Sequence, residues 1–155
     1  MLVVPDNLIS EIIARAEEEA PKEVCGWLAG KGNRVVRAYP VPNAAENSDH
    51  TFRMKPEAQL ATVFEIREAG LGLTATYHSH PRTPAEPSAR DLALAAYPDS
   101  FHIIVSLANG RPKIRCYRVT LTRGTGQWPY SSSTLTVVEG RPGARRPASW
   151  RCDRG

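Results

Sequence analysis

The chain has 155 residues, which suits one domain that buries roughly two thirds of the surface of its unfolded chain. Its formal net charge is +4, and residues 141–155 hold five arginines against one aspartate, so this end carries the whole excess and the rest is neutral. These features indicate no basic surface for a nucleic-acid partner, and no apolar run approaches the ~20 residues of a membrane helix. We therefore predict a domain over residues 1–138 and a basic, disordered tail at 139–155.

Short strands and helices alternate along the chain. The expected elements are a strand at 2–4, a helix from Asp6 to about Pro21, a hairpin of strands at 24–30 and 34–41, a helix at 56–70, a strand at 73–80, a helix at 88–97, a hairpin of strands at 101–108 and 113–121, and a last strand at 133–138. Asp6 is the expected N-cap of the first helix, and Asn109 and Gly110 the expected turn of the second hairpin. Strands occur both in hairpins and separated by helices, so we predict an α/β fold with a mixed sheet and flanking helices.

The three cysteines are scattered through the chain. Cys25, Cys116 and Cys152 are odd in number and form no Cys-x-x-Cys pair, so they indicate a reducing compartment and no disulfide framework. The first twenty residues have no basic start and become acidic, unlike a signal peptide. We predict a cytoplasmic protein.

The segment HSHPRTPAEPSARD, residues 78–91, contains three metal-binding side chains. Residues two apart on a strand share a face, so His78 and His80 can reach one ion, and Pro81 should end the strand there. Ser88 begins a helix and Asp91 falls in its first turn. Two imidazole nitrogens and one carboxylate oxygen would leave a fourth tetrahedral position for water, as in a catalytic zinc site.

A purely structural interpretation of the same residues remains open at this point. Ser88 and Asp91 are close to a capping box, in which Ser88 binds the N–H groups of the helix and Asp91 favours its positive end, and a His-x-His pair is a weak signal by itself. Other zinc sites fit less well. The cysteine spacing excludes a cysteine-rich structural site, and a zinc-deaminase site would need a Pro-Cys-x-x-Cys segment that the chain lacks.

Residues 78–91 also resemble the pattern His-x-His-Pro, five residues, Pro-Ser-x-x-Asp of the JAMM (MPN+) zinc metallopeptidases. The segment PKEVCGWLAG, residues 21–30, is similar to that family's Pro-x-Glu-x-Cys-Gly segment, and the order of elements resembles the family over about residues 1–120. The resemblance implies a JAMM/MPN (cytidine-deaminase-like) fold and a Zn²⁺ ion bound by His78, His80 and Asp91. It further implies that Glu23 is the general base and that Ser88 stabilises the oxyanion.

The short loops of this chain resemble the compact bacterial form of the family. That form implies a zinc peptidase or isopeptidase that cuts after the C-terminal Gly-Gly of a ubiquitin-like or sulfur-carrier protein, in cysteine or sulfur metabolism. A cell-wall or phage-tail peptidase and a non-catalytic MPN scaffold are the alternatives. His50 and His102 are expected at the surface or in packing, with His102 a candidate to support a ligand. Trp27 stands where relatives usually have a smaller aliphatic residue, so the packing near Glu23 is expected to differ from theirs more than the chemistry.

Overall fold

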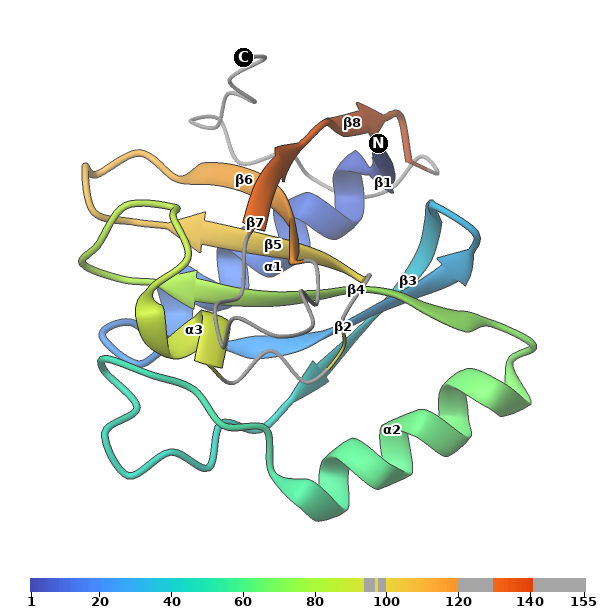
Figure 1. The fold of residues 1–155 in the computed structure, drawn as a ribbon, viewed down its shortest axis with the longest axis horizontal. Coiled ribbons are helices and arrows are strands. Elements are labelled where there is room, and N and C mark those ends of the chain that lie inside the picture. The colour runs from blue at the N-terminus through green and yellow to red at the C-terminus, as the bar shows by residue number, and fades with distance from the viewer. Residues whose placement is uncertain (94–96, 98–99, 120–129, 141–155) are drawn as a thin grey trace, which may run out of the picture.

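The computed structural model describes residues 1–93, 97, 100–119 and 130–140. In chain order the elements are β1 (Leu2–Pro5), α1 (Asp6–Glu19), β2 (Cys25–Lys31), β3 (Arg34–Val41), α2 (Pro56–Glu68), β4 (Gly72–His80), α3 (Ala89–Ala93), β5 (Phe101–Ser106), β6 (Lys113–Val119), β7 (Tyr130–Ser133) and β8 (Leu135–Val138). Within these described residues, eight strands form one mixed sheet in the order β7-β6-β5-β4-β2-β3-β1-β8 (Figure 1). The predicted mixed sheet with flanking helices is confirmed.

The two outer strands of the sheet, β7 and β8, are neighbours in sequence. They lie at opposite edges in the strand order, yet only Thr134 separates them, so the two edges must approach each other there. The Leu2 amide donates to the Thr134 carbonyl at 2.8 Å, and β8 runs parallel to β1. The sheet therefore curls around α1.

The main core lies between α1 and the concave face of this curled sheet. The predicted apolar stripe of α1 is buried, and it packs against side chains from β1, β2, β4, β5 and β6. Each large aliphatic side chain buried in this way contributes roughly 1.5–3 kcal/mol. The strand that carries the two histidines, β4, thus lies in the middle of the sheet and contributes to this core.

The opposite face of the sheet is covered only in part. Helix α2 packs there on a smaller cluster that contains Trp27, Tyr39 and Ile66 (Figure 1). The helix predicted at 56–70 is confirmed as Pro56–Glu68, and Gly70 follows it with a positive φ of 66°.

Several predicted details of the elements differ in the structure. Pro5 is the N-cap of α1, so the prediction for Asp6 is wrong: Asp6 is the first helical residue, and its Oδ1 accepts the Gly140 amide at 2.8 Å. The helix expected at 88–97 is described as Ala89–Ala93, and residues 94–96 lie outside the described part. Strand β7 was not predicted.

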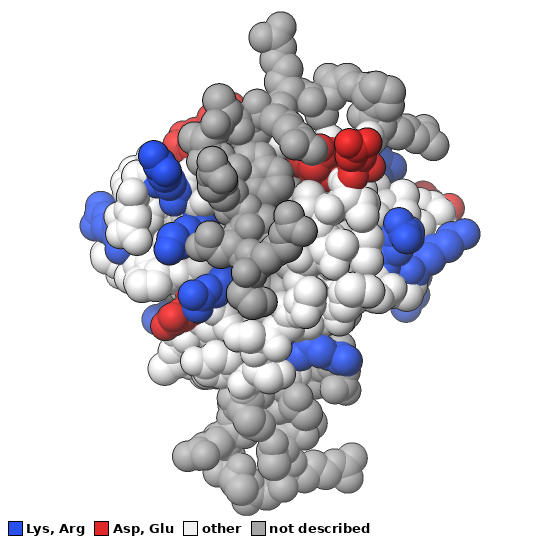
Figure 2. All heavy atoms as spheres, turned by 90° about the horizontal axis from the view of Figure 1, so that it is seen from above, with Lys and Arg blue, Asp and Glu red and all other residues white. Residues whose placement is uncertain are grey.

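The structure also bears on the predictions about the cysteines, the tail, membrane helices and surface charge. Cys25 and Cys116 are buried and free, while Cys152 and the tail from residue 141 lie outside the described residues. None of the described helices is long and apolar enough to span a membrane. Figure 2 shows one face of the molecule, on which the Lys and Arg side chains lie in separate small groups.

Candidate metal centre

His78 and His80 lie at the end of β4, where the sheet is paired on both sides. β4 is antiparallel to β2 and parallel to β5, and His78 is in register with Cys25. The strand ends at His80 because Pro81 follows and cannot donate to a ladder. Both histidines point to the same face, as predicted, and each is only 4% exposed.

Helix α3 brings Asp91 to the two imidazoles through a local capping arrangement. The Ser88 amide donates to Asp91 Oδ2 at 2.7 Å, and the Asp91 amide donates to Ser88 Oγ at 3.1 Å. This reciprocal pair is the capping box that the sequence predicted. The structural and the metal-site interpretations therefore coexist, because the same Asp91 oxygen also faces the histidines.

Three ligand atoms converge in a small triangle. His78 Nε2 lies 3.0 Å from His80 Nε2 and 3.4 Å from Asp91 Oδ2, and His80 Nε2 lies 3.2 Å from the same oxygen. Ligands at tetrahedral angles on zinc, with bonds of ~2.0–2.1 Å, are about 3.3 Å apart. The triangle thus has the dimensions of three corners of a zinc tetrahedron.

The protonation of these groups favours a cation among them. His80 Nδ1 lies 2.8 Å from the Pro84 carbonyl, which can only accept, so Nδ1 carries a proton and Nε2 is free to bind a metal. Burial lowers the pKa of His78 and keeps it neutral, as a ligand requires. Burial opposes ionisation of Asp91, but hydrogen bonds with both imidazoles and with Ser88 bring its pKa well below the usual value. Burial also opposes protonation of His80, but its bonds to Asp91 and the Pro84 carbonyl raise its pKa, and a cation would replace the proton that Nε2 then shares with Asp91. The donor set therefore fits a divalent cation such as zinc.

Glu23 lies beside this triangle with an unusual carboxyl group. It precedes β2, is 6% exposed, and its Oε2 is buried without a hydrogen-bond partner among the described residues. Burial raises the pKa of Glu23 to about 7, with His80 lowering and Asp91 raising it by smaller amounts. A carboxyl group with this pKa can both take and release a proton near neutral pH.

Two residues that the sequence analysis did not identify hold the site together. Ser79 is fully buried between the two histidines: its Oγ accepts the Val24 amide at 2.9 Å, and its amide donates to the Val24 carbonyl at 3.0 Å. Phe52 stacks on the His78 ring at 4.5 Å. A signal existed for Ser79, because a polar residue on the core-facing side of a strand requires a specific partner.

The other residues noted in the sequence lie outside the triangle. His50 is exposed, as predicted. His102 lies on β5, 3.0 Å from the Thr76 hydroxyl, and burial, with a smaller effect of His78, lowers its pKa to about 4. Trp27 is buried against α2 and meets Tyr97 edge to face at 5.4 Å.

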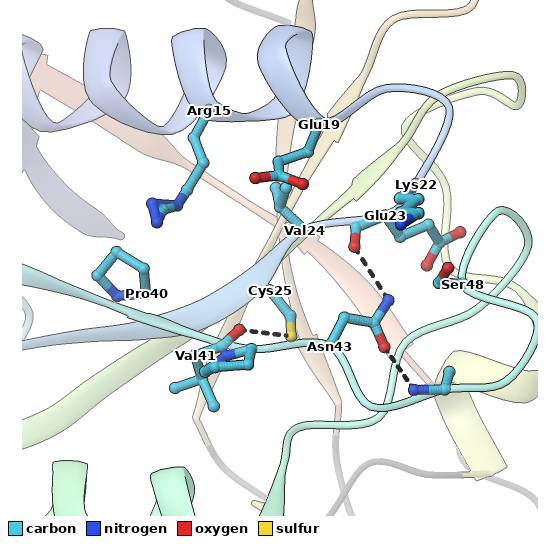
Figure 3. A pocket seen from close by; sticks show the side chains of 12 residues that line it. Arg15, Glu19, Lys22, Glu23, Val24, Cys25, Pro40, Val41, Asn43 and Ser48 are labelled. Carbon is cyan, nitrogen blue, oxygen red and sulfur yellow. Dashed lines mark hydrogen bonds between the residues drawn. The ribbon is translucent and has the colours of Figure 1, made fainter.

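A pocket of about 570 Å³ adjoins the main chain of Glu23. Its lining comes from the end of α1, the start of β2, and the end of β3 with the loop after it (Figure 3). Arg15 and Glu19 of α1 face Pro40 and Asn43 across it. Basic and acidic side chains alternate around the pocket, so its charge alone selects no ligand.

Comparison with known proteins extends these observations. The family model for prokaryotic homologues of the JAB domain matches residues 5–120. The CysO-cysteine peptidase of Mycobacterium tuberculosis is 34% identical over 122 residues, which are 77% of this chain and 83% of that protein. The desampylase of Haloferax volcanii is 34% identical over 103 residues, covering 65% of this chain and 74% of that protein.

Solved structures agree with the family match. Protein DSY2949 of Desulfitobacterium hafniense has a TM-score of 0.78 and 31% identity, with 90% of this chain and 94% of that chain covered. A JAB1/MPN domain protein of Archaeoglobus fulgidus has a TM-score of 0.56 and 22% identity over 88% of this chain and 97% of that chain, which supports the fold. The chain therefore belongs to the prokaryotic homologues of the JAB domain, within the JAMM metallopeptidase family that its motif resembles.

Proposed function

We propose that the protein is a zinc-dependent peptidase that hydrolyses the bond after the C-terminal Gly-Gly of a ubiquitin-like or sulfur-carrier protein. The observation that carries the proposal is the triangle of His78, His80 and Asp91 atoms, 3.0 to 3.4 Å apart, with the buried carboxyl group of Glu23 beside it. The similar proteins are named for related reactions: one as a CysO-cysteine peptidase and another as a desampylase.

In this proposal His78, His80 and Asp91 would hold the metal, Glu23 transfers protons, and Ser88 stabilises negative charge. A zinc ion held at this position would supply Lewis acidity, which can polarise a carbonyl group and lower the pKa of water. Glu23 accepts a proton from the attacking water and later gives it to the amine that leaves when the C–N bond breaks. The Ser88 hydroxyl accepts the Asp91 amide, so its own hydrogen is free to donate to the carbonyl oxygen as negative charge develops there.

The burial of the site favours a substrate whose backbone carries no side chains near the bond that is cut. The two histidines are 4% exposed and Glu23 is 6% exposed, so the reacting carbonyl must enter a recessed centre. Glycine allows a peptide backbone to come close to such a centre because it has no side chain. A cytoplasmic location is part of the proposal, since the described thiols of Cys25 and Cys116 are unpaired, as in a reducing compartment.

The test is cleavage of a sulfur-carrier-like protein that ends in Gly-Gly and is joined to one further residue. Mass spectrometry should show release of that residue after the last glycine. Changing Gly-Gly to Ala-Ala adds two methyl groups in a confined site, which commonly costs ~1–3 kcal/mol, or roughly ten- to a hundredfold in rate. Equal cleavage of both substrates, or cleavage of cell-wall peptides alone, would contradict the proposed substrate.

A further inference from the structure

The position of Glu23 depends on contacts outside any helix or strand. The residue comes two positions before β2, so no ladder hydrogen bonds of the sheet fix its main chain. Its buried Oε2 has no hydrogen-bond partner among the described residues. The direction of the carboxyl group therefore follows from how the main chain of Glu23 is held.

Both main-chain polar groups of Glu23 bond to the loop between β3 and α2. The Glu23 amide donates to the Ser48 carbonyl at 2.7 Å, and the Glu23 carbonyl accepts from Asn43 Nδ2 at 3.0 Å. Figure 3 shows the Asn43 amide group between Glu23 and the loop to which Asn43 itself belongs. The loop therefore binds the main chain of Glu23 on both sides of its Cα atom.

Asn43 uses its complete hydrogen-bonding capacity in this contact. Its Nδ2 also donates to the Thr51 carbonyl at 3.1 Å, and its Oδ1 accepts the amides of Ala45 at 2.9 Å and Arg53 at 3.0 Å. A side-chain amide offers two donors and two acceptors, so all four are satisfied. Aspartate would keep the acceptors but lose both donors, and glutamine would place the same group one methylene further out.

We infer that Asn43 is a positioning residue for Glu23: it fixes the main chain of the general base relative to the loop between β3 and α2. The inference rests on the proposed function, in which Glu23 moves the proton. Its hydrogen bonds reach Glu23, Thr51, Ala45 and Arg53 and none of the three candidate ligands. Asn43 should therefore affect turnover through Glu23 while leaving the metal in place.

The experiment compares Asn43→Ala, which removes all four hydrogen bonds, with Asn43→Asp, which keeps the two accepted from Ala45 and Arg53 and loses those to Glu23 and Thr51. The control is Arg53→Ala, because it removes a bond within the same loop, from Arg53 Nη2 to the Ala44 carbonyl at 3.4 Å. Misplacement of a reacting group by about 1 Å can cost ~10²-fold, so we expect kcat to fall about 10- to 100-fold in both Asn43 variants. KM and the zinc content per chain should match the parent, and Arg53→Ala should keep the parent kcat.

A double-mutant cycle shows whether Asn43 acts through Glu23. In a Glu23→Gln background, Asn43→Ala should cause little further loss of kcat, because the group that it positions is already disabled. Hydrogen exchange gives a readout independent of activity: the Glu23 amide should exchange faster in Asn43→Ala and at the parent rate in Arg53→Ala. An equal loss in both backgrounds, or an unchanged kcat in both Asn43 variants, overturns this inference. Full activity of Glu23→Gln alone would instead overturn the proposed function.

Discussion

The metal-ligand segment, residues 78–91, and the segment around Glu23 meet at one site but are held differently. His78 and His80 lie on a strand paired along both edges, and Asp91 is fixed by a reciprocal cap with Ser88, three positions earlier. Glu23 lies outside the sheet and is held by a loop that is 20 to 25 residues away in sequence. The candidate ligands are therefore fixed by the ladder of a central strand and by a local cap, whereas the main chain of the proposed general base is held by hydrogen bonds to a loop.

The largest expected effect is loss of a ligand. His80→Ala removes one corner of the triangle, so zinc affinity should fall by more than the ~10–100-fold typical of losing a residue that only supports a ligand. Peptide cleavage should become undetectable. Elemental analysis after dialysis measures the zinc, and His50→Ala, which removes an exposed histidine, is the matched control. If His80→Ala retains zinc like the control, the ligand assignment is wrong.

Glu23→Gln should distinguish the two regions most clearly, because it should lower turnover without lowering zinc binding. The amide cannot accept the proton from water, so turnover should fall by about 10²–10⁴-fold while zinc content and the thermal midpoint stay near those of the parent. Glu19→Gln is the control, since Glu19 lines the adjoining pocket and is exposed. Zinc loss in Glu23→Gln would show that this carboxylate is a ligand and not the base.

The same contrast explains what the sequence could predict. Two short-range rules, the alternation of side chains along a strand and the spacing of a capping box, predict that His78, His80 and Asp91 can converge, and both hold in the structure. Their assignment as zinc ligands came from the resemblance to a family. Glu23 was identified only through the resemblance to a family. Asn43, Phe52 and Ser79 were not identified, because their partners are 20, 26 and 55 residues away.

Long-range contacts also account for the errors in the fold. The Asp6 side chain is engaged by Gly140, 134 residues away, so the capping rule that predicted its role fails there. Strands β7 and β8 follow each other in sequence and yet lie at opposite edges of the sheet. The hydrophobic periodicity of a segment does not indicate which strand it will pair with. Local periodicity predicted most elements, whereas strand β7 depends on its pairing with β6 and the role of Asp6 on a contact between the two ends of the described chain.

Ser88→Ala should give a smaller effect than Glu23→Gln, within the ligand segment itself. The substitution removes a donor to the developing oxyanion, which costs up to about 10²-fold when the metal shares the charge, and removes a helix cap worth about 1 kcal/mol. Zinc should remain, because the bond to Asp91 Oδ2 comes from the Ser88 main chain. Steady-state kinetics measure the loss, and Ser88→Thr should restore most of the turnover. Failure of Ser88→Thr to do so would leave the hydroxyl without a catalytic role.

The smallest expected effect tests a ring contact between the loop that binds Glu23 and the ligand segment. Phe52 stacks on His78 at 4.5 Å, and an aromatic pair contributes ~0.5–1.5 kcal/mol beyond its buried area. Phe52→Ala should therefore weaken zinc binding about two- to tenfold, measured by competition with a chelator. At saturating zinc its kcat should stay within a few-fold of the parent, because the hydrogen bond from Asn43 to the Glu23 carbonyl persists. The control, Phe64→Ala, removes a side chain from the exposed face of α2 and should leave zinc affinity unchanged. A large fall in kcat with zinc affinity intact would mean that the loop acts on the base through Phe52 and would remove the distinction between the two regions.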